Sequence, residues 1–80
     1  MSGQLQQKAI DLLGVAALEI GSEERIDRIE ELAKTYSWKA IDRKMEELVD
    51  RGYVERLKAG IAAGGLTEKG RAALAQAPSA

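Results

Sequence analysis

Two stretches in the second half of the chain decide how it folds: residues 48–55, LVDRGYVE, and residues 66–71, LTEKGR. Gly52 follows a charged amphipathic run, which predicts that a helix ends there with a left-handed glycine. Residues 53–57 combine an aromatic residue with Val and alternate with charges, and this pattern favours a strand. Thr67 precedes a charged, alanine-rich run and predicts the N-cap of a last helix. The two stretches therefore predict a hairpin between two helices.

Three helices are predicted before the hairpin, over residues 4–18, 23–34 and 38–51, because apolar residues recur there at helical spacing. Ser22 and Ser37 precede the second and third of these helices and are good N-caps. Only the tripeptide TYS separates the second helix from the third, which predicts a tight turn. The order is therefore three helices, a hairpin and a fourth helix.

The predicted core consists of aliphatic side chains on one face of each helix. The inward-facing positions are Leu5, Ala9, Leu12, Leu13, Ala16 and Ala17 in the first helix, Ile26, Ile29, Leu32 and Ala33 in the second, and Ile41, Met45, Leu48 and Val49 in the third. Arg25 alternates with acids and is assigned to the solvated face. Gly14 either permits a close helix contact or is simply tolerated. Trp38 lies about 60° from Ile41 by helical geometry, which favours a core anchor over an outward-facing ring.

The composition indicates one small domain. The chain has 80 residues, of which 45% are apolar, so we expect a single domain over residues 1–77 and a disordered tail over 78–80. It has no Cys and no His, which excludes thiol catalysis, disulfides and the usual zinc sites. No apolar run reaches the roughly 20 residues of a membrane span, and the N-terminus lacks the features of a signal peptide. We therefore expect a cytoplasmic protein without metal or other cofactor, and no enzyme, since no phosphate-binding loop motif occurs.

The charge is distributed unevenly. The chain carries 12 Lys or Arg and 13 Asp or Glu, and its net charge of -1 lacks the overall basicity of many nucleic-acid binders. Residues 1–34 carry a net charge of -3, whereas residues 35–80 carry +2. The second part is therefore favoured for any contact with phosphate.

Several motifs between residues 23 and 75 form a pattern known from one protein family. They are ELA at 31–33, the Ser37 cap, the apolar spacing of Ile41, Met45 and Leu48, LxxRGYVE at 48–55, and LTEKGR at 66–71. On these motifs the chain resembles the winged helix-turn-helix transcription regulators typified by MarR- and PadR-like repressors. Thr35 stands where such proteins often carry glycine. The resemblance implies a mostly helical α+β fold: a three-helix bundle, a two-stranded β-hairpin wing over 53–66, and a C-terminal helix.

The resemblance also implies duplex DNA as the partner, with the helix over 38–51 in the major groove. Lys39 and Arg43 lie in the first half of this helix, where recognition helices reach base edges. Arg43 suits a bidentate contact with guanine, and basic side chains on the wing suit phosphates or the minor groove. The candidate DNA-binding residues are Ser37, Trp38, Lys39, Arg43, Lys44, Arg56 and Lys58.

These assignments have alternatives. Lys39 and Arg43 could instead pair with Glu46 and Glu47 along the helix. The cations of the wing could serve only to make the surface soluble. Acids in the second half of the helix repel phosphate, so DNA binding requires end-on insertion. The alternative functions are a winged-helix module that binds another protein without DNA, which the sequence pI of about 5.4 favours, and a phage or plasmid accessory DNA-binding protein.

A homodimer is expected, because one module of this size makes few base contacts and two half-sites raise the affinity. Two surfaces are candidates for the dimer contact. One is the end of the first helix, VAALEI at 15–20, and the other is the alanine-rich last helix.

Overall fold

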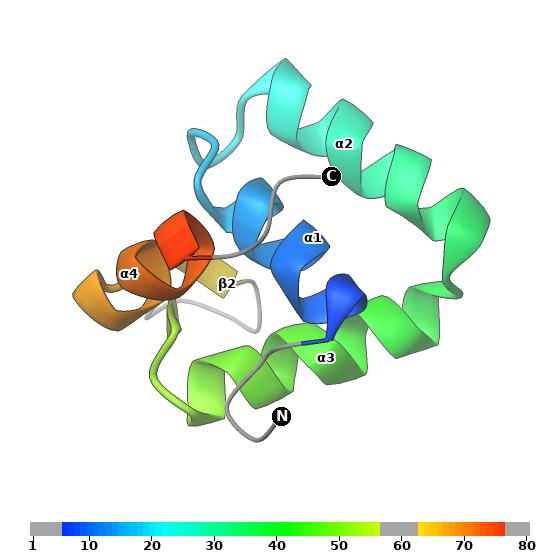
Figure 1. The fold of residues 1–80 in the computed structure, drawn as a ribbon. Coiled ribbons are helices and arrows are strands. Elements are labelled where there is room, and N and C mark those ends of the chain that lie inside the picture. Colours follow the sequence, from blue (N-terminus) through cyan, green and yellow to red (C-terminus); the bar gives the residue numbers. More distant parts are fainter. Residues whose placement is uncertain (1–5, 57–62, 77–80) are drawn as a thin grey trace.

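The computed structural model of the chain describes residues 6–56 and 63–76, which form four helices and a two-stranded antiparallel hairpin (Figure 1). The predicted mostly helical α+β class is confirmed. In chain order the elements are α1 (Gln7–Ala16), α2 (Glu23–Thr35), α3 (Trp38–Asp50), β1 (Val54–Arg56), β2 (Ala63–Leu66) and α4 (Glu68–Gln76).

Local capping fixes the ends of α2 and α3. The Oγ of Ser22 accepts a hydrogen bond from the Arg25 N–H at 3.2 Å, and the Oγ of Ser37 accepts one from the Ala40 N–H at 3.1 Å. Gly52 has a φ of 85° and follows α3 in the left-handed conformation that the sequence predicts. Both N-caps and the glycine stop are therefore confirmed. The turn between α2 and α3 is shorter than predicted, because α2 continues through Thr35.

The core is centred on α1, which lies between α2, α3 and α4 in Figure 1. The buried apolar side chains are Ala9, Leu12, Leu13, Val15 and Ala16 of α1, together with Leu32, Ile41, Leu48 and Val54 from the elements around it. Within the described residues α1 is shorter than the predicted range 4–18, and Ala17, expected to face inward, is exposed after its end. Leu5 lies outside the described residues.

The inward face of α2 differs from the prediction. Ile26, assigned to the core, is 49% exposed, whereas Arg25, assigned to the solvated face, is 6% exposed. Arg25 shares a face with the half-buried Ile29 and with Leu32, at helical spacing. Its guanidinium donates hydrogen bonds to the carbonyl oxygens of Leu18 at 3.2 Å and Gly64 at 3.0 Å. Because these backbone acceptors lie inside, the arginine and not the isoleucine takes the inward position.

The hairpin pairs Val54 with Leu66 and Arg56 with Ala63, and the unequal spacing marks a bulge between them. Val54 is buried, while the two residues after it are exposed. The described strands are shorter than the predicted ranges 53–57 and 61–66, whose inner ends lie outside the described residues. The Tyr53 N–H donates to the Leu48 carbonyl at 2.9 Å, so the chain passes from α3 to β1 through a tight three-residue turn, residues 51–53.

The LTEKG stretch joins the hairpin to α4. The Thr67 hydroxyl donates to the Gly52 carbonyl at 2.6 Å and accepts a hydrogen bond from the Gly70 N–H at 3.0 Å, so it both caps α4 and ties it to the end of α3. Gly70 is required because a Cβ there would lie 2.0 Å from the Tyr53 carbonyl oxygen. The first turn of α4 therefore packs directly on the backbone before β1, and Leu74 packs against the core.

Candidate nucleic-acid interface

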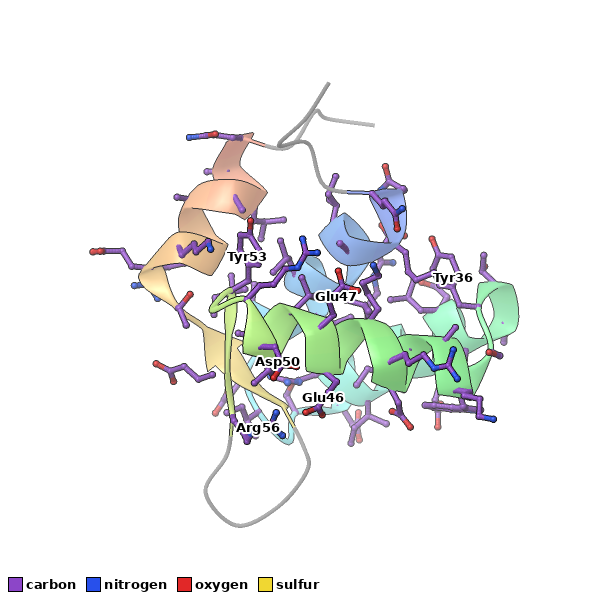
Figure 2. The ribbon with its side chains drawn as sticks, turned by 90° about the horizontal axis from the view of Figure 1, so that it is seen from below. Tyr36, Glu46, Glu47, Asp50, Tyr53 and Arg56 are labelled. Atoms are coloured by element: carbon purple, nitrogen blue, oxygen red, sulfur yellow. The ribbon has the colours of Figure 1, made fainter. Side chains whose placement is uncertain are left out.

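The exposed face of α3 is the surface to which the sequence assigns DNA binding, and Figure 2 looks onto this helix. Trp38, Lys39 and Arg43 are exposed in its first half. Trp38 is 56% exposed, so its favoured assignment as a core anchor is wrong. The neighbouring aromatic residue takes the inward position instead: Tyr36 packs against the core, and its hydroxyl donates to Asp11 Oδ2 at 3.0 Å.

Lys39 and Arg43 carry the unneutralised positive charge of this face. Within the described parts of the chain neither side chain forms an ion pair. The alternative in which they pair with Glu46 and Glu47 along the helix is not realised there, because other cations occupy both carboxylates. Two charged groups are thus presented to solvent beside a large exposed aromatic ring.

The side chain of Arg56, on β1, lies against the second half of α3, which carries the acidic residues Glu46 and Asp50. Its guanidinium pairs with the Glu46 carboxylate, and its Nη2 lies 3.6 Å from Asp50 Oδ1. The hydrogen bond from Arg56 lowers the pKa of Glu46, and the same bond raises the pKa of Arg56. Figure 2 shows these three residues, hereafter the Arg56 clamp, along one side of α3. The clamp ties the hairpin to α3 and offsets part of the negative charge on its exposed face.

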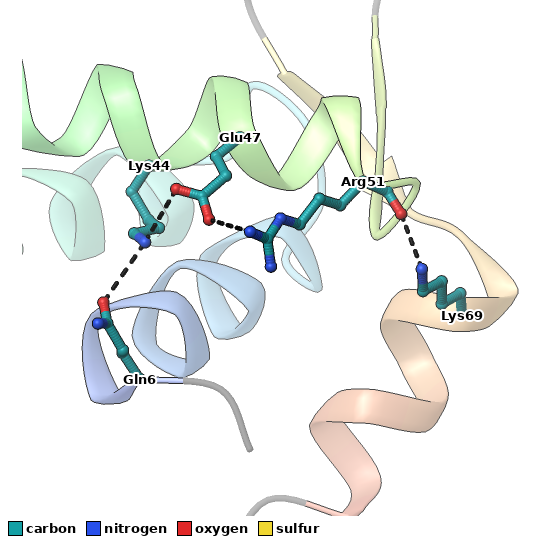
Figure 3. Close-up of polar contacts among 5 residues, drawn as sticks. All are labelled: Gln6, Lys44, Glu47, Arg51 and Lys69. Carbon is teal, nitrogen blue, oxygen red and sulfur yellow. Dashed lines mark hydrogen bonds and ion pairs between the residues drawn. The ribbon is translucent and has the colours of Figure 1, made fainter. Parts of the chain in front are cut away.

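A second set of polar contacts holds the other side of α3 (Figure 3). Lys44 Nζ donates to Glu47 Oε1 at 3.1 Å and to Gln6 Oε1 at 3.4 Å, and Arg51 pairs with Glu47 at 3.4 Å. The hydrogen bond from Lys44 is the main cause that lowers the pKa of Glu47. Lys69 Nζ donates to the Arg51 carbonyl at 2.9 Å. This set links α3 to the start of α1 and to α4.

The seven candidate residues therefore fall into separate groups. Trp38, Lys39 and Arg43 are all exposed in the first half of α3. Ser37 is exposed but its oxygen caps α3. The Lys44 side chain is only 15% exposed and is engaged by Glu47, not open to a phosphate as expected. Arg56 is exposed but engaged by acids, and Lys58 lies outside the described residues.

Sequence reasoning missed the Arg56 clamp, although a signal for it exists. Glu46 and Asp50 are spaced i,i+4 and so share a face of α3. A strand that follows the helix after a tight turn folds back along it, which brings the first charged strand residues near that face. The sign of Arg56 then makes pairing with the two carboxylates the expected result.

Two further findings concern the described residues. Among residues 6–56 and 63–76, no three acidic side chains gather as the ligands of a metal ion. No helix in this part of the chain has the length and the apolar character needed to cross a membrane.

No protein-family model matches the chain, and neither a curated protein nor a solved structure is significantly similar to it. The family resemblance therefore depends on the motifs quoted above and stays a prediction.

Proposed function

We propose that this chain is a winged helix that binds duplex DNA as a transcription regulator, with α3 entering the major groove by its first half. The observation that carries the proposal is that Lys39 and Arg43, in the first half of α3, are exposed and form no ion pair with any residue that the structure describes. The other described cations between the start of α3 and the end of β1 all have carboxylate partners: Lys44, Arg51 and Arg56. Positive charge that is exposed at one end of a helix can neutralise the phosphates along a DNA groove.

The geometry of a recognition helix suits these residues. The N-terminal residues of such a helix contact base edges, and an arginine there can donate two hydrogen bonds to guanine. Arg43 has this role in our proposal, and Lys39 contacts phosphate. Trp38 is exposed on the first turn of the same helix, and in our proposal its ring adds contact with sugar or base atoms.

The Arg56 clamp bears on the acids that argue against DNA binding. Glu46 and Asp50 share the exposed face of α3, but the positive charge of Arg56 offsets part of their negative charge. Repulsion of phosphate is thereby weakened, and end-on insertion keeps the acidic half of α3 furthest from the groove floor. In this proposal the main role of Arg56 is to hold the hairpin against α3, and contact with phosphate is its secondary role.

The test is fluorescence anisotropy of labelled random duplex DNA at rising salt. Phosphate contacts make the logarithm of the affinity fall linearly with the logarithm of salt concentration. Loss of a phosphate contact by Lys39→Ala is expected to lower the slope by about one. Arg43→Ala is expected to cost about 1–3 kcal/mol on a selected site.

Arg28→Ala is the matched control, because Arg28 is a similarly exposed arginine that already pairs with Glu31 on α2. This variant should bind DNA almost as the parent does. Absence of binding at low salt, or equal losses for Arg28→Ala and Arg43→Ala, would reject the proposed surface. A phage or plasmid accessory DNA-binding protein would give the same biophysical result, and the neighbouring genes in the genome would distinguish it from a regulator.

A winged-helix module that binds another protein is the second candidate. The observation that favours it is the mixed charge of the exposed α3 face, where Asp42, Glu46 and Asp50 alternate with cations. Charged surfaces of both signs suit a protein partner of complementary pattern. If DNA binding is absent at low salt, the same Lys39 and Arg43 variants should instead weaken capture of that partner.

A further inference from the structure

Asp42 is the one acidic residue of α3 without a cationic partner among the residues that the structure describes. The other acids of this helix, Glu46, Glu47 and Asp50, all form ion pairs. Asp42 is exposed, and so is Arg43 directly after it, which also lacks an ion pair there. An acidic and a basic side chain are therefore exposed at consecutive positions, in the half of α3 that enters the major groove in the proposed function.

A free carboxylate in this half of α3 opposes DNA binding unless the groove supplies a partner for it. Phosphates repel a negative charge. Lys39, three residues earlier, has the spacing to neutralise Asp42, yet the two do not pair in the structure. On the base edges of the major groove the hydrogen-bond donors are the N4 amino group of cytosine and the N6 amino group of adenine. A carboxylate on the groove floor is therefore stabilised by one of these two bases.

The two bases differ in what stands beside the amino group. Adenine presents the N7 acceptor next to N6, and this acceptor repels the second oxygen of a carboxylate. Cytosine presents N4 without an acceptor beside it on the same base, so an acidic side chain favours cytosine, whereas an amide, with one donor and one acceptor, favours adenine. We propose that Asp42 accepts a hydrogen bond from cytosine N4 and is a specificity-determining residue of this surface.

Arg43 adds the second base to this recognition. Consecutive helical residues point about 100° apart, so Asp42 and Arg43 reach toward opposite strands of a groove that holds α3. Arginine bound bidentately to guanine O6 and N7 fills the edge of one base pair, which leaves the neighbouring pair to the aspartate. Guanine on one strand and cytosine on the other, in neighbouring pairs, correspond to two consecutive guanines on one strand. This role of Asp42 rests on the proposed DNA-binding function and adds to it the bases that the site contains.

Selection of bound sequences from a random duplex library, with the full chain at low salt, tests this role. The parent should enrich sites with two consecutive guanines on one strand. Asp42→Asn should change one of these two pairs from G·C to T·A, because asparagine binds adenine N6 and N7, and Asp42→Ala should lose the preference at that pair without gaining another. Fluorescence anisotropy on duplexes that differ only there measures the ratios, and the parent should bind the G·C duplex about fivefold or more tightly than the others.

Asp27→Asn is the matched control, because Asp27 is an exposed aspartate of α2 that likewise has no ion pair within residues 6–56 and 63–76. This variant removes the same charge and should keep every base preference of the parent. Far-UV circular dichroism checks that each variant folds. Absence of DNA binding at low salt would overturn the proposed function and the role of Asp42 with it. DNA binding with the same base preferences in the parent and in Asp42→Asn, or a change other than from G·C to T·A, would overturn the role of Asp42 alone.

Discussion

At the scale of single residues, Arg25 is the least expected feature. It is buried, and its guanidinium donates to the Leu18 and Gly64 carbonyls, while burial lowers its pKa without removing its charge at physiological pH. Arg25→Leu should destabilise the fold, because each buried carbonyl left without a donor costs about 1–3 kcal/mol. Urea denaturation measures the loss. Arg28→Leu, at an exposed position of the same helix, should stay within about 0.5 kcal/mol of the parent. Equal losses of stability in the two variants would show that the hydrogen bonds of Arg25 make no specific contribution to stability.

Two glycines form a matched pair at the same scale. A Cβ at Gly70 would lie 2.0 Å from the Tyr53 carbonyl oxygen, whereas one at Gly14 would meet no atom within 4 Å. Gly70→Ala should therefore destabilise by about 1–3 kcal/mol through overpacking, although alanine is the better helix former. Gly14→Ala should stabilise by about 0.5–1 kcal/mol, since only the helix preference changes. Thermal or urea unfolding of both variants decides this, and stabilisation by both would contradict the close approach of α4 to Tyr53.

The limits of sequence reasoning appear at this scale. Ser22, Ser37 and Gly52 were predictable because a cap depends on the residue and its nearest neighbours along the chain. Trp38 and Arg25 were not, because their burial depends on contacts distant in sequence. Helical spacing gives Trp38 a position near the core edge, but it cannot show that Tyr36 already fills that side. Nor does helical spacing show that the Gly64 carbonyl of β2 accepts a hydrogen bond from the Arg25 guanidinium.

At the scale of elements, the Arg56 clamp joins β1 to α3 and makes stability depend on pH. Because Arg56 lowers the pKa of Glu46, the clamp stabilises the fold above the ordinary carboxyl pKa of about 4.5 and loses that effect as the pH falls through the lowered value. The urea midpoint should therefore fall between about pH 5 and pH 3, and less steeply in Glu46→Gln. Glu55→Gln is the control, since Glu55 of β1 has no ion pair among the described residues. If both variants follow the parent, the clamp does not contribute to stability.

The candidate site was predictable in part for the same reason. Helical spacing alone places Lys39 and Arg43 opposite Ile41, and the structure has both exposed. It also places Lys44 on a flank within i,i+3 reach of Glu47, but only the approach of α1 brings Gln6 to this lysine. Pairing between a helix and the following strand requires the bend after Gly52 and the hairpin register, neither of which periodicity specifies.

At the scale of the whole molecule, a chain of 80 residues with a small aliphatic core is expected to have modest stability alone. Pairing of two chains through the candidate dimer surfaces, residues 15–20 and α4, would add to it, and unfolding would then be coupled to dissociation. The melting temperature of the parent should therefore rise by about 2–4 °C for each tenfold increase in concentration, as expected for a unit of two chains. Ile20→Glu should melt at a temperature independent of concentration, whereas Ile26→Glu should keep the dependence of the parent. Differential scanning calorimetry at several concentrations makes the comparison, and a parent whose melting temperature does not change would show that the folded unit is the single chain.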